Sequence, residues 1–395
     1  MGIHMIRMRR FGTREILLDI SKLKQLFFKS KSDFFSKREI EEIEQVAISN
    51  GFLNAQEYLL EMHSKFKRSL SVYRPFKLNL KKIPKEIFKS SYGSILNGDS
   101  LQWLHDSKNK NKVNLIMTSP PFGLLNQKSY GNETAQDYCE WFRPFAEGFN
   151  NVLKKNGSLV IDIGGTWRKG SPVRSLYHFD LLQMLCKEYG FYLCQEHFWW
   201  NPSKLPSPAS WVTVKRSRVK DSINCIWWLS KSPNPKASNR NILSPYSERM
   251  LDVLKNGHHQ GARPSGHFIS PNFAKNNGGA IPPNLIAAAN SESNSFYLEY
   301  CKKHKLKIHP ARFPSALPDY FIRFLTTKND LVLDPFGGSS VTGYVAEKLK
   351  RQWVTIEIDK EFSKTGIARF LDKSPYKILR SKYEIYSPCQ GSVMD

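Results

Sequence analysis

Residues 331–359, LVLDPFGGSSVTGYVAEKLKRQWVTIEID, contain the pattern that decides the fold. The run LVLD predicts a buried strand, PFGGSS a tight glycine turn, VTGYVAEKLKR a helix, and QWVTIEID a second strand. Glycines let a backbone approach a ligand closely, and an acid that ends the next strand can accept hydrogen bonds from ribose hydroxyls. Two glycines in such a turn also occur for purely steric reasons, so this unit alone leaves ligand binding open.

Strands and helices alternate through residues 91–200 as well. Buried strands are predicted for KVNLIMTS (112–119), SLVIDIGG (158–165) and FYLCQEHFWW (191–200). Apolar residues at helical spacing predict a helix in 135–157, ending just before Gly157, and another in 179–190, closed by Gly190. Such alternation predicts an α/β fold, with a mostly parallel sheet and helices on both of its faces.

Two regions differ from this pattern. Residues 1–90 are basic, with 19 Lys and Arg against 10 Asp and Glu, and the segments 36–52 and 54–70 predict a helical hairpin. Packing against the main body and DNA binding are both open for this extension. Residues 201–308 are rich in Pro, Ser and Asn, and apart from the strand-like SINCIWWLSK (222–231) they show little periodicity.

The charge balance points to a polyanionic partner. The net charge is +24 and the pI is near 9.7, which favours a nucleic-acid partner. Residues 201–240 hold eight Lys and Arg and one acid. The cluster Lys215, Arg216, Arg218 and Lys220 lies beside a Trp-rich segment, and basic residues supply phosphate affinity. We expect this cluster to contact DNA.

Other site types find little support. The six cysteines, at 139, 186, 194, 225, 301 and 389, form no C-x-x-C pair, which favours reduced thiols in a cytosolic protein. No zinc-ligand spacing is present, so we expect no metal. No apolar run reaches the roughly 18 residues that a membrane span requires, so no membrane association is expected.

A second motif, NLIMTSPPF at 114–122, ends an apolar run in two prolines. Neither proline can continue a sheet ladder, so the chain must leave the strand in one rigid shape. Ser119 and Phe122 are then displayed beside Pro120 and Pro121 at a strand end, which is where ligands bind in open α/β sheets. The dinucleotide and P-loop fingerprints are missing. The remaining candidate is a nucleoside cofactor without a phosphate cradle, S-adenosylmethionine.

DPFGGSS (334–340) together with TSPPF (118–122) resembles the amino-group DNA methyltransferases, which pair D-P-F-x-G-S-G with [DNS]-P-P-[YF]. The resemblance implies a Rossmann-like, S-adenosylmethionine-dependent methyltransferase fold. It also implies that Phe122 stacks on a base flipped out of duplex DNA, and that Ser119 and the neighbouring carbonyl accept hydrogen bonds from its exocyclic amine. The cofactor residues that it implies are Asp99, Asp334, Phe336, Gly337, Gly338, Ser339 and Glu357.

The order of the motifs resembles the β arrangement of this family, a circular permutation with target recognition in the middle. Within the family, Ser before Pro-Pro is associated with N4 of cytosine, and Asp or Asn with N6 of adenine. The segments WNPSKLPSPASWV, RVKDSIN, RPSGH, NNGGAIPPNL, HPARFP and VIDIGG resemble the PvuII-type N4-cytosine methyltransferases over roughly residues 91–370. The expected divisions are a helical extension (1–90), a catalytic half (91–200), a target-recognition region (201–308), a cofactor-binding half (309–375) and a tail (376–395).

The same resemblance implies roles for individual residues. Asp162, 43 residues after Ser119, is a candidate proton acceptor for the amine, although it can equally cap the Gly164-Gly165 turn. Asp99 resembles the acid that contacts the adenine, and an Asx-turn also accounts for it. Ser340 departs from the family pattern, which usually has Gly there.

The expected function is therefore site-specific methylation of N4 of cytosine in double-stranded DNA, in the bacterial cytoplasm. A cognate restriction endonuclease acting on the same site is an expected partner. Adenine N6 methylation by the same fold, a non-catalytic DNA-binding scaffold and RNA methylation stay open as alternatives. The sequence does not give the recognition site or the oligomeric state.

Overall fold

The structure is a computed structural model of the whole chain, and it describes residues 5–7, 17–19, 45, 48, 83–123, 134–135, 137–257, 271–290 and 295–372. The chain divides into two compact units, residues 1–77 and 78–395. In the first unit, the short strands β1 (Met5–Arg7) and β2 (Leu17–Asp19) pair antiparallel. Most of the predicted helical hairpin at 36–70 lies outside the described residues.

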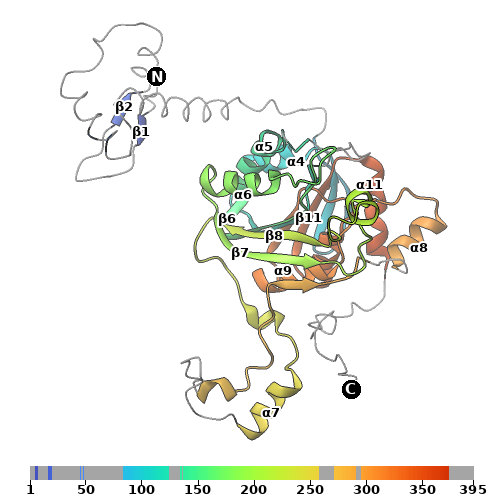
Figure 1. Cartoon of the computed structure of the whole chain (residues 1–395). Coiled ribbons are helices and arrows are strands. Elements are labelled where there is room, and N and C mark those ends of the chain that lie inside the picture. Colours follow the sequence, from blue (N-terminus) through green and yellow to red (C-terminus); the bar gives the residue numbers. More distant parts are fainter. Residues whose placement is uncertain are drawn as a thin grey trace. The chain divides into compact units, whose positions relative to one another are not determined.

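The second unit is built on a nine-stranded sheet with the order β3-β4-β11-β10-β5-β6-β8-β7-β9 (Figure 1). Five of its eight neighbouring pairs are parallel, so the predicted mostly parallel sheet is confirmed. The strands are β3 (Lys85–Lys89), β4 (Gly93–Asn97), β5 (Val113–Thr118), β6 (Leu153–Ile163), β7 (Tyr192–Trp200), β8 (Ile223–Ser230), β9 (Leu285–Ala287), β10 (Leu331–Asp334) and β11 (Gln352–Glu357).

The middle of the sheet joins two segments that are far apart in sequence. Strand β10 pairs parallel with β5, with Val332 opposite Leu115 and Leu333 opposite Ile116. From β5 the chain moves outward to β6 on one side, and from β10 it moves outward to β11 on the other. The strand order therefore reverses between β5 and β10, and open α/β sheets bind ligands at the carboxyl ends of such strands. This late insertion of β10 and β11 between β4 and β5 is the predicted permutation.

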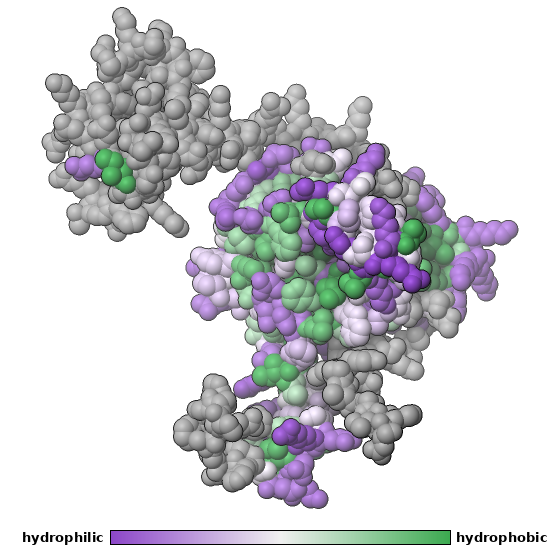
Figure 2. Space-filling view, in the orientation of Figure 1, coloured by the Kyte–Doolittle hydropathy of each residue, from purple (hydrophilic) through white to green (hydrophobic). Residues whose placement is uncertain are grey.

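Helices cover both faces of the sheet, because the inner strands are apolar on both sides. One core cluster contains Ile116, Leu159 and residues of α4 (Ser100–His105), α5 (Tyr138–Val152) and α6 (Tyr177–Lys187). The other contains Leu115, Val160 and residues of α9 (Ala316–Leu325) and α10 (Val341–Lys348). Neighbouring strand residues thus point to opposite faces, as pleating requires. Outside the clusters, hydrophilic and hydrophobic residues are interspersed on the face seen in Figure 2.

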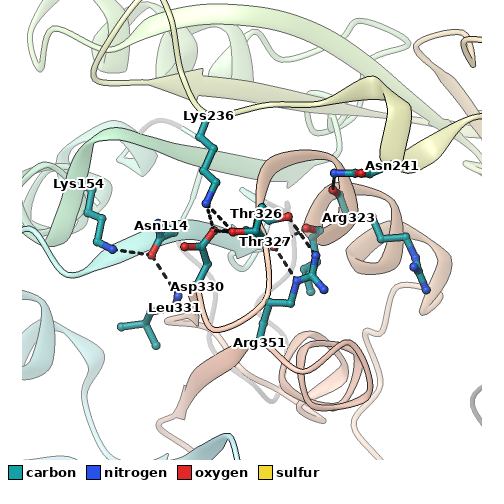
Figure 3. A network of polar contacts seen from close by, with 11 residues as sticks. Asn114, Lys154, Lys236, Asn241, Arg323, Thr326, Thr327, Asp330, Leu331 and Arg351 are labelled. Atoms are coloured by element: carbon teal, nitrogen blue, oxygen red, sulfur yellow. Dashed lines mark hydrogen bonds and ion pairs between the residues drawn. The ribbon is translucent and has the colours of Figure 1, made fainter.

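Polar contacts hold the two halves together at the amino ends of β5 and β10 (Figure 3). The side-chain oxygen of Asn114 accepts hydrogen bonds from the Leu331 amide at 3.1 Å and from Lys154 Nζ at 3.0 Å. Lys236 Nζ lies 2.5 Å from Asp330 Oδ2, and this contact helps to lower the pKa of Asp330 against the effect of its burial. The opposite, carboxyl edge of the same strands is left for the ligand.

Shorter helical elements complete the unit. The α-helices are α7 (Glu248–Asn256), α8 (Phe296–Lys303) and α11 (Lys360–Gly366). A π-helical turn covers Ser210–Val214, and 3-10 turns cover Ser107–Asn109, Asn239–Ile242, Pro271–Ala274 and Ile367–Leu371.

Three sequence predictions need correction. Strands β1, β2 and β3 lie within residues 1–90, so the prediction of helix is wrong at these three segments. Strand β3 is an edge strand that contains two lysines, and because of these charges it was not recognised as a strand that pairs with β4. The helix predicted in 135–157 is α5, which ends at Val152, and Gly157 lies inside β6 instead of ending the helix. Strand β8, within the stretch predicted as a target-recognition insertion, pairs with β6 and β7 in the main sheet. Gly190 does follow α6, with φ 72°.

Candidate active site

Five neighbouring strands place polar side chains at one edge of the sheet. In spatial order, Asp99 follows β4, Glu357 ends β11, Asp334 ends β10, Ser119 follows β5, and Asp162 lies one residue before the end of β6. These strands are mutually parallel, so all five residues lie at their carboxyl ends. The predicted catalytic and cofactor motifs therefore meet at one edge, which we call the carboxyl edge.

A buried carboxylate joins the two motifs. Asp334 Oδ1 accepts hydrogen bonds from Thr118 Oγ1 at 2.7 Å and from the Phe336 amide at 3.2 Å, and Oδ2 accepts from Thr342 Oγ1 at 2.7 Å. Burial raises the pKa of Asp334 to about 6, against the opposing effect of these donors. The contact with Thr118 fixes the end of β10 against the end of β5. Direct cofactor contact by Asp334 stays a prediction.

Ser119 and Asp162 form a hydrogen-bonded pair. Ser119 Oγ donates to Asp162 Oδ2 at 3.1 Å, and Asn224 Nδ2 on β8 donates to the other carboxylate oxygen, also at 3.1 Å. Asp162 is 1% exposed, and burial raises its pKa to about 6, while the donors Asn224 and Ser119 and the charge of Lys204 act in the opposite direction. A carboxylate with this pKa is mostly ionised at neutral pH and can accept a proton there.

Phe122 lies against the backbone just beyond β6. A Cβ atom built on Gly164 would lie 2.6 Å from Cε2 of the Phe122 ring and 3.2 Å from Oδ1 of Asn224. The turn that carries the ring is held by Tyr138, whose hydroxyl donates to the Pro121 carbonyl at 2.8 Å. The hydroxyl of Tyr177 donates to the Gly164 carbonyl. The aromatic ring is thus fixed beside the Ser119–Asp162 pair.

Replacement of Gly164 by Ala tests this packing. The added methyl group must displace the Phe122 ring, so we expect a loss of about 1–3 kcal/mol of folding stability from overpacking and a fall in methyl transfer. Thermal unfolding and initial rates measure the two effects. In the double variant Gly164→Ala/Phe122→Ala, the stability cost of the added methyl should largely disappear; purely additive effects would show that the two groups do not touch.

The glycine turn after β10 packs on β11. The Gly337 amide donates to the Ile356 carbonyl at 2.8 Å, and the Gly338 amide donates to Glu357 Oε2 at 2.7 Å. Gly338 has φ 50°, and a Cβ there would lie 3.3 Å from the ring of His309. Burial raises the pKa of Glu357 to about 7 and lowers that of His309 to about 4. His309 thus packs against the glycine turn in its neutral form.

Ser340 adopts a left-handed conformation, with φ 56°. This is the position at which the family usually has Gly, and the backbone keeps a conformation that favours Gly. The Ser340 hydroxyl lies 3.1 Å from Thr355 Oγ1, and its amide donates to the Gly337 carbonyl at 2.7 Å. These contacts hold Ser340 in its left-handed conformation.

The other predicted cofactor residues have identifiable packing partners. Asp99 is the N-cap of α4 and accepts from the Leu101 amide at 3.0 Å, as an Asx-turn predicts. Phe336 packs against Phe145, with ring centroids 4.8 Å apart. The Ser339 carbonyl accepts from Arg369 Nε at 2.8 Å. Cofactor contact stays a prediction for all three.

The predicted DNA-binding residues lie on the segment between β7 and β8, residues 201–222, which we call the recognition loop. Lys215, Arg216, Arg218 and Lys220 are all exposed. Lys215 Nζ lies 4.7 Å from the centroid of the Trp211 ring. Because β8 is antiparallel to β6 and β7, this loop begins and ends at the carboxyl edge. It therefore adjoins the Ser119–Asp162 pair.

Within the described part of the chain, no group of three or more His, Cys, Asp or Glu is arranged to hold a metal ion. The five cysteines found there are free thiols. None of the helices described has the length and apolarity that a bilayer crossing requires.

Comparison with known proteins agrees with this geometry. Residues 113–368 match the family model described as DNA methylase. The chain belongs to the DNA methylase family. The type II methyltransferase M.PvuII of Proteus hauseri is 46% identical to this DNA methylase over 293 residues, which are 73% of this chain and 87% of the relative. M.BglII of Bacillus subtilis is 26% identical over 71% of this chain and 69% of its own.

A solved structure also resembles the enzyme. The PvuII DNA methyltransferase, described as cytosine-N4-specific, aligns with a TM-score of 0.59 and 40% identity, covering 76% of this chain and 93% of that one.

Several site residues of this DNA methylase were missed by sequence reasoning. Asn224 follows a polar loop and looks like an ordinary strand residue, but β8 returns beside β6 and places its amide on Asp162. Thr118 and Thr342 were counted as parts of a strand and a helix, although both donate to Asp334. For Asn224, the pairing of β6 with β8 was the missing information, and no local pattern encodes it.

Proposed function

We propose that this DNA methylase transfers a methyl group from S-adenosylmethionine to N4 of a cytosine flipped out of duplex DNA. The observation that carries the proposal is the Ser119–Asp162 hydrogen bond of 3.1 Å at the carboxyl edge, beside the Phe122 ring. An aromatic platform, an acceptor for an exocyclic amine and a buried carboxylate are the groups that methylation of a base amine requires.

The groups act in a defined order. Ser119 donates its hydroxyl hydrogen to Asp162, which leaves the oxygen lone pairs of Ser119 to accept an N–H of the cytosine amine. Bound S-adenosylmethionine would supply an electrophilic methyl group to the cytosine nitrogen, with S-adenosylhomocysteine as the leaving group. The surplus amine proton then moves through Ser119 to Asp162. Rigid acceptors held by Pro120 and Pro121 orient the amine for attack.

Cytosine is favoured over adenine by Ser119 and by the relatives. A neutral hydroxyl stands where an Asp or Asn is associated with adenine, and the PvuII enzyme that aligns with the chain is described as cytosine-N4-specific. Methylation of duplex DNA with tritiated cofactor, followed by digestion to nucleosides, tests the proposal. Label should appear in N4-methylcytosine; label in N6-methyladenosine alone would reverse the base assignment. Methylation of RNA in preference to DNA would reject the substrate.

The carboxyl edge suits the cofactor. Glu357, at the end of the strand next to β10, carries a carboxylate suited to ribose hydroxyls, and the Gly337-Gly338 bend keeps the backbone close to β11 and to His309. Asp99 follows the next strand, where the adenine is expected. The residues present therefore fit the group.

Replacement of Glu357 by Gln tests cofactor binding. The amide can accept from either Gly338 or Asp359, whose amides lie 2.7 and 2.8 Å from the two carboxylate oxygens, but not from both. It also loses the charge that ribose hydroxyls favour. We expect about 10–100-fold weaker binding of S-adenosylhomocysteine by calorimetry, in line with about 1.5–3 kcal/mol for a hydrogen bond to a charged group. Unchanged binding would exclude Glu357 from the cofactor site, and absence of binding by the wild-type protein would favour a non-catalytic scaffold.

A biological setting is supported by the relatives, which are named type II methyltransferases. We infer that the enzyme acts on bacterial DNA in the cytoplasm and protects one sequence from a cognate restriction endonuclease. Plasmid DNA from a host that expresses the enzyme should resist that endonuclease, and DNA from a host with an inactive variant should be cut.

A further inference from the structure

A β-hairpin follows β6 directly and rises from the active site. In residues 166–175, Trp167 and Arg174 form an antiparallel bridge, and the Arg168 amide donates to the Val173 carbonyl at 2.8 Å. The Ser175 amide donates to the Thr166 carbonyl at 2.9 Å. These bonds give the segment a defined shape, which we call the post-β6 hairpin. It begins four residues after Asp162.

The post-β6 hairpin is attached to the recognition loop. Arg174 pairs with Asp221 in an ion pair between Nη1 and Oδ2, and Arg218 Nη2 donates to the Pro172 carbonyl at 3.1 Å. The Arg174 guanidinium also lies 5.1 Å from the centroid of the Trp167 ring. Two segments more than 25 residues apart in sequence therefore form one connected surface beside the catalytic pair.

This surface carries unneutralised positive charge. Arg168 and Lys169 are exposed near the tip of the hairpin, and residues 166–175 contain no acid. The one acid of the recognition loop, Asp221, already pairs with Arg174. Among the described residues, no carboxylate forms an ion pair with Arg168 or Lys169. The sequence interpretation assigned DNA contact to the basic cluster of the recognition loop and left it open for residues 1–90, but it did not include this hairpin.

We propose that Arg168 and Lys169 of the post-β6 hairpin bind the phosphodiester backbone of duplex DNA beside the flipped base. The inference rests on the proposed function and adds a DNA-contacting element to it. Flexible cations near a hairpin tip suit phosphate contacts, which position a protein on DNA without reading sequence. Because the hairpin is an extension of β6, phosphate binding there places the DNA relative to Asp162. The base-reading contacts remain with the recognition loop.

The double variant Arg168→Ala/Lys169→Ala tests the proposal. Binding of a duplex oligonucleotide is measured by fluorescence anisotropy between about 50 and 200 mM salt. Two lost phosphate contacts should reduce the slope of log affinity against log salt by about 1.8, and the KM for DNA should rise while kcat stays near that of the wild type. The matched control Lys302→Ala/Lys303→Ala removes two exposed charges from α8.

The outcomes separate the proposal from its competitors. A slope equal to that of the wild type would overturn it, and an equal reduction in the control would assign the effect to overall charge. The exchange variant Arg168→Lys/Lys169→Arg should keep the wild-type slope. A reduced slope in this variant would point to a structural role of these side chains. Wild-type protein that binds duplex DNA but never methylates it would reject the proposed function while leaving the hairpin contact intact.

Discussion

Replacement of Asp162 by Asn is expected to lower kcat by about 10²–10⁴-fold, the usual contribution of a general base. The amide keeps the size and can still accept from Ser119, which donates to Oδ2 at 3.1 Å in the wild type. It cannot accept the amine proton. Single-turnover methylation of duplex DNA measures the effect, and cofactor affinity by calorimetry serves as the control, because it should not change. A variant with near wild-type turnover would remove Asp162 from the reaction.

The pH dependence of the same residue gives a second readout. Burial raises the pKa of Asp162 to about 6, and only the ionised form accepts a proton. Wild-type kcat should therefore fall as the pH is lowered through about 6. The Asp162→Asn variant, which has no ionisable group there, should lose this dependence. If kcat of the variant still falls at low pH as it does in the wild type, a group other than Asp162 causes that fall.

Replacement of Asn224 by Asp is expected to lower kcat at neutral pH by about 100-fold or more. The new carboxylate would stand where the Asn224 amide now donates to Asp162 Oδ1 at 3.1 Å. Two carboxyl groups this close cannot both ionise, so the pKa of Asp162 rises above its present value. Activity should then recover as the pH is raised, and a pH–rate profile measures that shift.

A second variant, Asn224→Ala, separates the effect of charge from that of geometry at this position. Asn224→Ala removes the donor without adding a charge, so it should lose less activity than Asn224→Asp, and its acid limb should move less. If both variants lose the same activity with no shift of the profile, Asn224 acts only in folding. In that case thermal unfolding should show that both variants are less stable than the wild-type protein.

Local sequence patterns were sufficient for the elements that carry the motifs. The strands β5 and β10 and the 158–163 part of β6 are buried and mostly apolar, and Pro or Gly follows each of them. The carboxyl ends of parallel strands share one edge, so placing Ser119 and Asp334 at strand ends was enough to predict one site. The Thr118–Asp334 hydrogen bond confirms that these strand ends meet.

Features that depend on which strands pair could not be predicted from the sequence. The role of β8 depends on which strands it pairs with, and its 223–230 sequence suits an edge strand as well as the interior position that it takes. Asn224 was therefore missed, since its proximity to Asp162 follows from that pairing. The attachment of the post-β6 hairpin to the recognition loop was missed for a related reason, because the contact from Arg218 to Pro172 spans 46 residues and has no local signature.

The central claim is that Ser119, Asp162 and Phe122 enclose a flipped cytosine. A crystal structure of the enzyme with S-adenosylhomocysteine and a duplex that contains the recognition site tests it most directly. We expect an extruded cytosine stacked on Phe122, with its exocyclic nitrogen within hydrogen-bond distance of Ser119 Oγ. A target base bound elsewhere on the enzyme, or an extruded adenine in this position, would contradict it.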